Sequence, residues 1–92
     1  MYLGLDLGTT GLKAIVIDET QAVVASATAE ISVARPHPGW SEQDPESWTK
    51  AAVQALGALA KKRDCSAVTG MGLAGHMHGA TLIGKSDEVL RP

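Results

Sequence analysis

The sequence predicts an α/β protein with one mixed sheet: a three-strand antiparallel meander, a crossover helix and a parallel fourth strand. Three observations support this. Three apolar stretches with period-two alternation occupy residues 3–33 and are joined by short polar turns. A stretch with helical periodicity follows at residues 45–63. An apolar stretch comes next, and a strand–helix–strand passage normally places the new strand parallel to its neighbour.

The strands should pair in the spatial order third, second, first, fourth, because short turns join the first three and a helix precedes the fourth. The expected strands, with a final edge segment, cover residues 3–7, 12–17, 22–33, 67–74, 80–83 and 89–90. In the first strand, leucines alternate with glycines and one aspartate, Asp6. One face of that strand is therefore apolar and the other carries a carboxylate.

The crossover helix is expected to begin at Asp44, an N-cap acceptor that is followed by Pro45 at the first helical position. Basic residues at 61–63 suit its C-terminal end. Its predicted apolar stripe consists of Trp48, Ala51, Ala52, Ala55, Leu56, Leu59 and Ala60.

Composition narrows the function classes. The 92 residues allow one domain at most, and a net charge of −2 does not favour nucleic acid or an anionic membrane as partner. The single cysteine, Cys65, excludes an internal disulfide and favours a reducing compartment. No apolar run approaches a membrane span, and a strand from Leu3 leaves no room for a signal peptide. The abrupt end at Pro92 leads us to expect a fragment of a longer protein.

The first strand leads into a turn of small residues, Gly8–Gly11, in which Thr9 and Thr10 supply hydroxyl groups. Such a turn lets a polyanion approach its backbone N–H groups closely. Asp6 is costly to bury unless it meets a cation or hydrogen-bond donors, and Lys13 adds a positive charge. This combination suits a metal–nucleotide phosphate. It is not a P-loop, because a strand follows rather than a helix. The alternative is an ordinary hairpin whose aspartate starts the turn.

Two further motifs are rejected. Residues 70–75 match Gly-x-Gly-x-x-Gly, but the helix that a dinucleotide site requires does not follow. His76 and His78, with His37 and Cys65, lack the paired spacing of a structural zinc site. The two histidines fit better in a polar loop at the C-terminal end of a parallel strand, where open α/β sheets bind ligands. A surface loop without function is the alternative.

Three stretches together resemble the FGGY family of carbohydrate kinases, and within it the branch that acts on D-xylulose. They are residues 4–13, 35–45 and 72–80. The first stretch alone is shared with actin-like and heat-shock ATPases, whereas the other two in this order are specific. The resemblance spans the whole chain.

The resemblance implies a ribonuclease-H-like (actin-like ATPase) fold, in which residues 1–92 form the N-terminal part of the first, sugar-binding domain. It implies ATP-dependent phosphorylation of a ketopentose, D-xylulose, to D-xylulose 5-phosphate in the cytoplasm. The implied partners are the sugar and ATP, with Mg²⁺ as cofactor and neither nucleic acid nor membrane. A homodimeric parent is compatible with it.

The resemblance also assigns roles to residues. Asp6 would serve catalysis by holding Mg²⁺ through water, and Met77 and His78 would contact the sugar. Four residues would bind the nucleotide phosphates: Gly8, Thr9, Thr10 and Lys13. His76 stands where these kinases usually have Gln, which leaves the exact sugar open. The general base and the adenosine site would lie outside this chain, so the chain alone should be inactive.

Two alternatives remain at this point. One is a fragment of an actin-like or heat-shock-type ATPase that uses no sugar, and the other is a small stand-alone binding module. The loop with Met77 and His78 discriminates against the first, because such ATPases do not need it.

Overall fold

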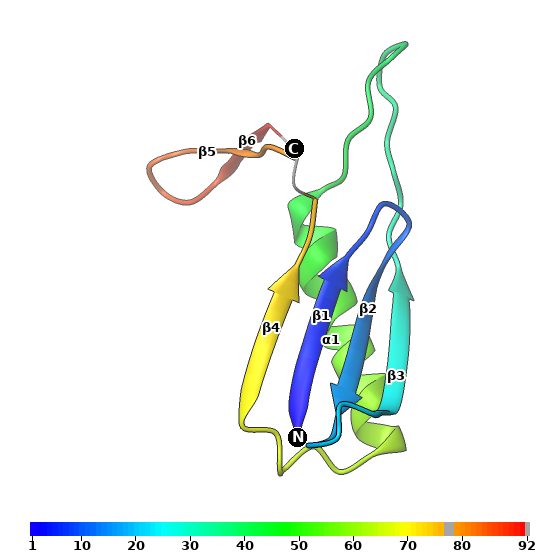
Figure 1. The fold of residues 1–92 in the computed structure, drawn as a ribbon. Helices are drawn as coiled ribbons and strands as arrows, with labels where there is room; N and C mark the ends of the chain where they lie inside the picture. The colour runs from blue at the N-terminus through cyan, green and yellow to red at the C-terminus, as the bar shows by residue number, and fades with distance from the viewer. Residues whose placement is uncertain (77–78, 92) are drawn as a thin grey trace.

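The computed structural model describes residues 1–76 and 79–91 of the chain. Figure 1 shows a mixed sheet with helix α1 (Pro45–Lys62) against it and a small hairpin beyond. The elements are β1 (Tyr2–Leu7), β2 (Gly11–Ile17), β3 (Val23–Glu30), α1 (Pro45–Lys62), β4 (Gly70–Ala74), β5 (Leu82–Ile83) and β6 (Val89–Arg91).

The main sheet has the strand order β3-β2-β1-β4, which confirms the predicted order. β1 pairs with β2 and β2 pairs with β3 in antiparallel fashion, whereas β1 and β4 are parallel. In this register Asp6 lies opposite Lys13 on one side and Ala74 on the other. The predicted meander, crossover helix and parallel strand are therefore all present.

Several predicted strand bounds are wrong. β3 and β4 are shorter than the expected residues 22–33 and 67–74, and β5 is shorter than 80–83. Before β4 the chain turns, with the N–H of Val68 donating to the carbonyl of Cys65 at 3.1 Å. Within the described residues, β5 and β6 pair with each other in a separate two-stranded sheet. Local apolarity predicted these extensions, but hydrogen-bond partners decide where a strand ends.

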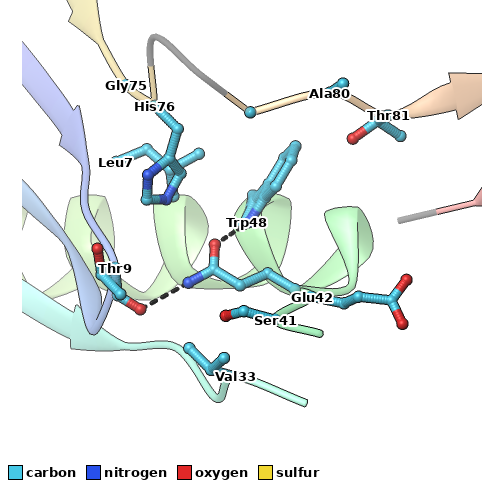
Figure 2. A pocket seen from close by; sticks show the side chains of 12 residues that line it. Leu7, Thr9, Val33, Ser41, Glu42, Trp48, Gly75, His76, Ala80 and Thr81 are labelled. Carbon is cyan, nitrogen blue, oxygen red and sulfur yellow. Dashed lines mark hydrogen bonds between the residues drawn. The ribbon is translucent and has the colours of Figure 1, made fainter. Parts of the chain in front are cut away.

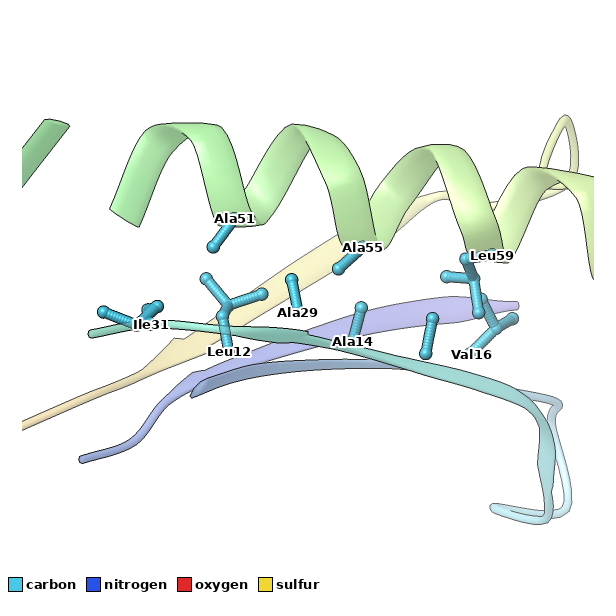
Figure 3. Close-up of a cluster of buried hydrophobic side chains, with 9 residues drawn as sticks. Leu12, Ala14, Val16, Ala29, Ile31, Ala51, Ala55 and Leu59 are labelled. Atoms are coloured by element: carbon cyan, nitrogen blue, oxygen red, sulfur yellow. The ribbon is translucent and has the colours of Figure 1, made fainter. Parts of the chain in front are cut away.

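Helix α1 packs on β2 and β3 and buries a small-residue core between helix and sheet (Figure 3). The buried side chains are Leu12, Ala14, Val16, Ala27, Ala29, Ile31, Ala51, Ala55 and Leu59. Ala60 was predicted in the apolar stripe but is exposed, and Ala58 packs against the core instead. Ala60 lies about 140° around the helix from the buried Ala55 and so faces away from the sheet, whereas Ala58 lies only about 60° from it.

The start of α1 lies at the same edge of the sheet as the turn between β1 and β2 (Figure 1). The predicted N-cap is confirmed: the Asp44 carboxylate accepts a hydrogen bond from the N–H of Glu46 at 3.1 Å. Pro45 occupies the first turn, as expected. In the part of the chain that the structure describes, no helix is long and apolar enough to span a membrane.

Asp18 organises the turn between β2 and β3, and its titration tests this part of the fold. Its Oδ1 accepts hydrogen bonds from the Thr20 hydroxyl at 2.6 Å and the Ala22 N–H at 3.1 Å. These hydrogen bonds, the Thr20 hydroxyl first, hold the pKa of Asp18 below its usual 3.8. Its contribution to stability is therefore present above pH 3.8 and is lost as the pH falls through the folded-state pKa.

We expect Thr20→Val to raise the pKa of Asp18 toward its usual value, because the hydroxyl that stabilises the carboxylate is gone. Titration of the side-chain carboxyl by NMR measures this pKa directly. An unchanged pKa in Thr20→Val would contradict the assignment of the Thr20 hydroxyl as the main cause.

Candidate functional site

Backbone hydrogen bonds hold the turn between β1 and β2 against the sheet. The N–H of Gly8 donates to the carbonyl of Gly11 at 2.8 Å, and the N–H of Ile31 donates to the carbonyl of Thr10 at 3.0 Å. A Cβ on Gly11 would lie 2.7 Å from the carbonyl oxygen of Ala29, so this close approach requires glycine. Two of the turn's four carbonyl groups are thus satisfied by backbone N–H groups.

The other two carbonyl groups contact side chains from distant parts of the sequence. The amide Nε2 of Gln43 donates to the carbonyl of Thr9 at 2.6 Å. The imidazole Nε2 of His76 lies 3.1 Å from the carbonyl oxygen of Gly8. Since a carbonyl can only accept, this contact requires the His76 tautomer that is protonated on Nε2. All four carbonyl groups of the turn therefore have donors.

In contrast to the carbonyl groups, the donors of Thr9 and Thr10 in the same turn are not used by the described residues. Within residues 1–76 and 79–91, neither Thr9 nor Thr10 has an acceptor for its N–H or its hydroxyl. No cis peptide bond occurs in the described residues, and in a trans peptide the C=O and the next N–H point in opposite directions. Anchoring the Gly8 and Thr9 carbonyls therefore directs the Thr9 and Thr10 N–H groups away from His76 and Gln43. The result is a cluster of donors suited to an anion.

A cavity of about 810 Å³ lies on the side of the turn from which Gln43 and His76 reach it. Its walls are the turn itself, the segment that leads into α1, and the loop after β4. In Figure 2, His76 and Trp48 both border this space, and Ala80 and Thr81 lie across it from Ser41 and Glu42. A cavity of this size can hold a small polar molecule.

One rim of the cavity is tied to the C-terminal strand. Glu42 lines the cavity, and its carboxylate lies 3.3 Å from the guanidinium of Arg91 in β6. The same guanidinium stacks over the Trp40 ring at 4.5 Å from its centroid. Trp40 in turn meets the His37 ring edge-on, with 4.6 Å between centroids. These contacts connect the loop before α1 to the segment that follows β5.

Asp6 and Lys13 lie in a second groove of about 480 Å³, on the sheet face opposite α1. Both side chains are exposed, and within the described residues the Asp6 carboxylate accepts no hydrogen bond and makes no ion pair. A carboxylate with available oxygens, beside an anion site, fits a hydrated Mg²⁺ ion. Among the residues described, no three carboxylate, imidazole or thiol groups gather at one point, so any metal here would take water or phosphate as further ligands.

The sequence-predicted site residues thus form two groups. Asp6 and Lys13 lie together in the second groove, and Gly8, Thr9 and Thr10 form the turn. The predicted sugar contacts, Met77 and His78, lie outside the described residues.

Sequence reasoning missed Gln43 and assigned Trp48 only to the core. The Trp48 indole N–H donates to the Gln43 Oε1 at 2.9 Å, so both residues belong to the site (Figure 2). The topology contained a usable signal. A crossover from β3 to β4 must start the helix at the edge where β1 ends, which brings the polar run before Asp44 next to the turn.

Comparison with known proteins shows the family to which the chain belongs. The model of a protein family, described as "FGGY family of carbohydrate kinases, N-terminal domain", matches residues 1–92. The chain is 55% identical to a xylulose kinase of Klebsiella pneumoniae and 50% identical to one of Escherichia coli (strain K12), each over 92 residues. Each alignment covers 100% of this chain but only 19% of the length of the relative.

The crystal structure of a protein from Brucella ovis, described as a xyloylose kinase, is also similar. Its TM-score is 0.95 at 58% identity, covering 99% of this chain and 20% of that one. Together with the observed strand order, these matches confirm the predicted ribonuclease-H-like, actin-like ATPase fold class.

The contact between His76 and the turn can be tested by replacing the imidazole. We expect His76→Ala to accelerate exchange of the Gly8 amide hydrogen about fivefold, since a hydrogen bond of about 1 kcal/mol that steadies the turn is lost. His76→Gln can still donate from its own Nε2, so exchange should stay within about twofold of wild type. NMR hydrogen exchange measures this, with the Gln21 amide in the β2–β3 turn as internal control. Equal exchange in all three proteins would refute the contact.

Proposed function

Because the chain belongs to the FGGY family of carbohydrate kinases, we propose that it is the N-terminal part of an ATP-dependent sugar kinase. The proposed substrate is a ketopentose, D-xylulose, which is phosphorylated on its terminal hydroxyl to D-xylulose 5-phosphate. The observation that carries the kinase assignment is the hydrogen bonding of the turn Gly8–Gly11. Every carbonyl of the turn has a donor, and the N–H groups of Thr9 and Thr10 point away from the side chains that hold the carbonyls. The choice of sugar rests on the relatives named xylulose kinases.

In this proposal the turn binds the phosphate that is transferred. The N–H groups and hydroxyls of Thr9 and Thr10 supply fixed donors, and Lys13 adds positive charge from the adjoining strand. Asp6 holds the hydrated Mg²⁺, which neutralises phosphate charge when it is bound. Phosphoryl transfer is catalysed mainly by positioning and by electrostatic stabilisation of the transferred group. Fixed donors supply both and need no reorganisation during the reaction.

We place the sugar beside the loop after β4. His78 and Met77 are proposed to contact it, on the strength of the family resemblance. The neighbouring residues His76, Ala80 and Thr81 line the cavity, which supports a small ligand on this side of the turn. The acceptor hydroxyl also needs a general base, which we place outside residues 1–92, so the chain alone should not turn over.

We also propose that residues 1–92 form the N-terminal part of a larger first domain. Met71 and Leu73 of the edge strand β4 are 59% and 73% exposed, on the half of the sheet that α1 leaves uncovered. An open apolar edge of this kind favours further elements of the same domain packing there. ATP use and the free thiol of Cys65 favour the cytoplasm as location.

The substrate is tested by a sugar panel. We expect the full-length protein to release ADP in the presence of D-xylulose with a kcat/KM at least about tenfold above that for D-ribulose, D-gluconate or glycerol, because missing or misplaced hydroxyls leave polar groups unpaired. A coupled ADP assay measures all four sugars. Absence of D-xylulose turnover, or a clear preference for another sugar, would reject the assignment.

The roles of Asp6 and His78 are separable in the same protein. Asp6→Asn keeps the size and removes the charge, so turnover should fall by about two orders of magnitude with the KM for sugar unchanged. His78→Ala should instead weaken sugar binding and leave Mg·ATP binding nearly intact. Asp64→Asn, at an exposed position after α1, is the matched control and should change neither. Near-normal turnover in Asp6→Asn would contradict the assignment.

A further inference from the structure

We propose that Gln43 is a positioning residue for phosphoryl transfer, a role that rests on the kinase function proposed above. Its side-chain amide bridges the helix α1 and the phosphate-binding turn, although Gln43 and Thr9 are 34 positions apart in the sequence. The bridge fixes the direction of the one peptide unit whose N–H belongs to Thr10. The Gln43 side chain also lines the cavity beside the turn, and in this proposal it acts on the phosphates through the backbone of the turn.

The orientation of the Gln43 amide is determined by chemistry. The indole Nε1 of Trp48 can only donate a hydrogen bond, and the carbonyl of Thr9 can only accept one. The amide oxygen must therefore face Trp48, at 2.9 Å, and the amide nitrogen must face Thr9, at 2.6 Å. The flipped amide would place donor against donor at one end and acceptor against acceptor at the other, so a single orientation is stable.

The carbonyl of Thr9 and the N–H of Thr10 belong to the same planar, trans peptide unit. While Gln43 holds that carbonyl, the Thr10 N–H points in the opposite direction and cannot rotate out of place. If the carbonyl were released, the peptide could turn and present an oxygen to the phosphates. That oxygen would repel them, whereas the N–H attracts them.

A rigid support stands behind the amide. Trp48 is half-buried at the start of α1, and the helix is anchored to the sheet one turn later by the buried Ala51 and then Ala55. Gln43 directly precedes the N-cap residue Asp44, so its backbone is also held by the helix start. The position of the Thr10 N–H is thereby tied to the packed core.

Isosteric variants test the two ends of the bridge in the full-length protein. Gln43→Glu keeps the shape and can still accept from Trp48, but it places a carboxylate oxygen against the Thr9 carbonyl. Gln43→Met keeps the length and loses both hydrogen bonds. Trp48→Phe removes only the indole N–H. Gln54→Glu makes the same chemical change as Gln43→Glu at an exposed position on α1 and serves as the control.

We expect Gln43→Glu to raise the KM for ATP and lower kcat, so that kcat/KM for ATP falls at least about tenfold, as small misplacements of a binding group do. In Gln43→Met the kcat/KM for ATP should fall somewhat less than in Gln43→Glu. In Trp48→Phe it should fall by about threefold, because the Thr9 contact remains in that variant. The KM for the sugar should stay within about twofold in all four proteins, and Gln54→Glu should match wild type.

Two results would overturn the proposal. One is a Gln43→Glu protein whose ATP kinetics equal those of Gln54→Glu. The other is a fall in kcat alone, with both KM values unchanged and the melting temperature lowered, because that pattern means loss of folded protein. If wild type phosphorylates no ketopentose, the proposed substrate fails separately. Calorimetry with Mg·ATP then decides the role of Gln43: at least about tenfold weaker binding by Gln43→Glu supports it, and unchanged binding rejects it.

Discussion

The site depends on the hydrogen bonding of one short turn. Four successive carbonyl groups, from Gly8 to Gly11, each accept a hydrogen bond from the protein, two from backbone N–H groups and two from side chains. Because each peptide unit is planar and trans, fixing a carbonyl also fixes the N–H that follows it. The donors that would meet a phosphate are therefore positioned by contacts on the opposite side of the turn.

The fold brings the required segments to that turn. β1 ends there, and α1, which crosses from β3 to the parallel strand β4, begins at the same edge. The end of β4 also lies at this edge, because β4 runs parallel to β1. Gln43 and His76 consequently reach two neighbouring carbonyl groups from segments that are far apart in sequence.

The strand order and the helix start were predictable from sequence because local patterns determine them. Short turns imply an antiparallel meander, and Asp44 with Pro45 marks a helix start. The strand ends were less predictable. The hydrogen bond from the Ile31 N–H to the Thr10 carbonyl continues the β2–β3 register by one residue, and local sequence does not encode where such pairing stops. Gln43 was missed for the same reason. Its role comes from tertiary placement, and glutamine before an N-cap has no distinctive pattern of its own.

The most direct test of this account is a crystal structure of the full-length protein with Mg²⁺ and a non-hydrolysable ATP analogue. The account predicts that the nitrogen atoms of Thr9 and Thr10 lie within about 3.2 Å of phosphate oxygens. It also predicts that the carbonyl groups of Gly8 and Thr9 remain bonded to His76 and Gln43. Phosphates bound away from this turn, or carbonyl groups rotated toward them, would contradict it.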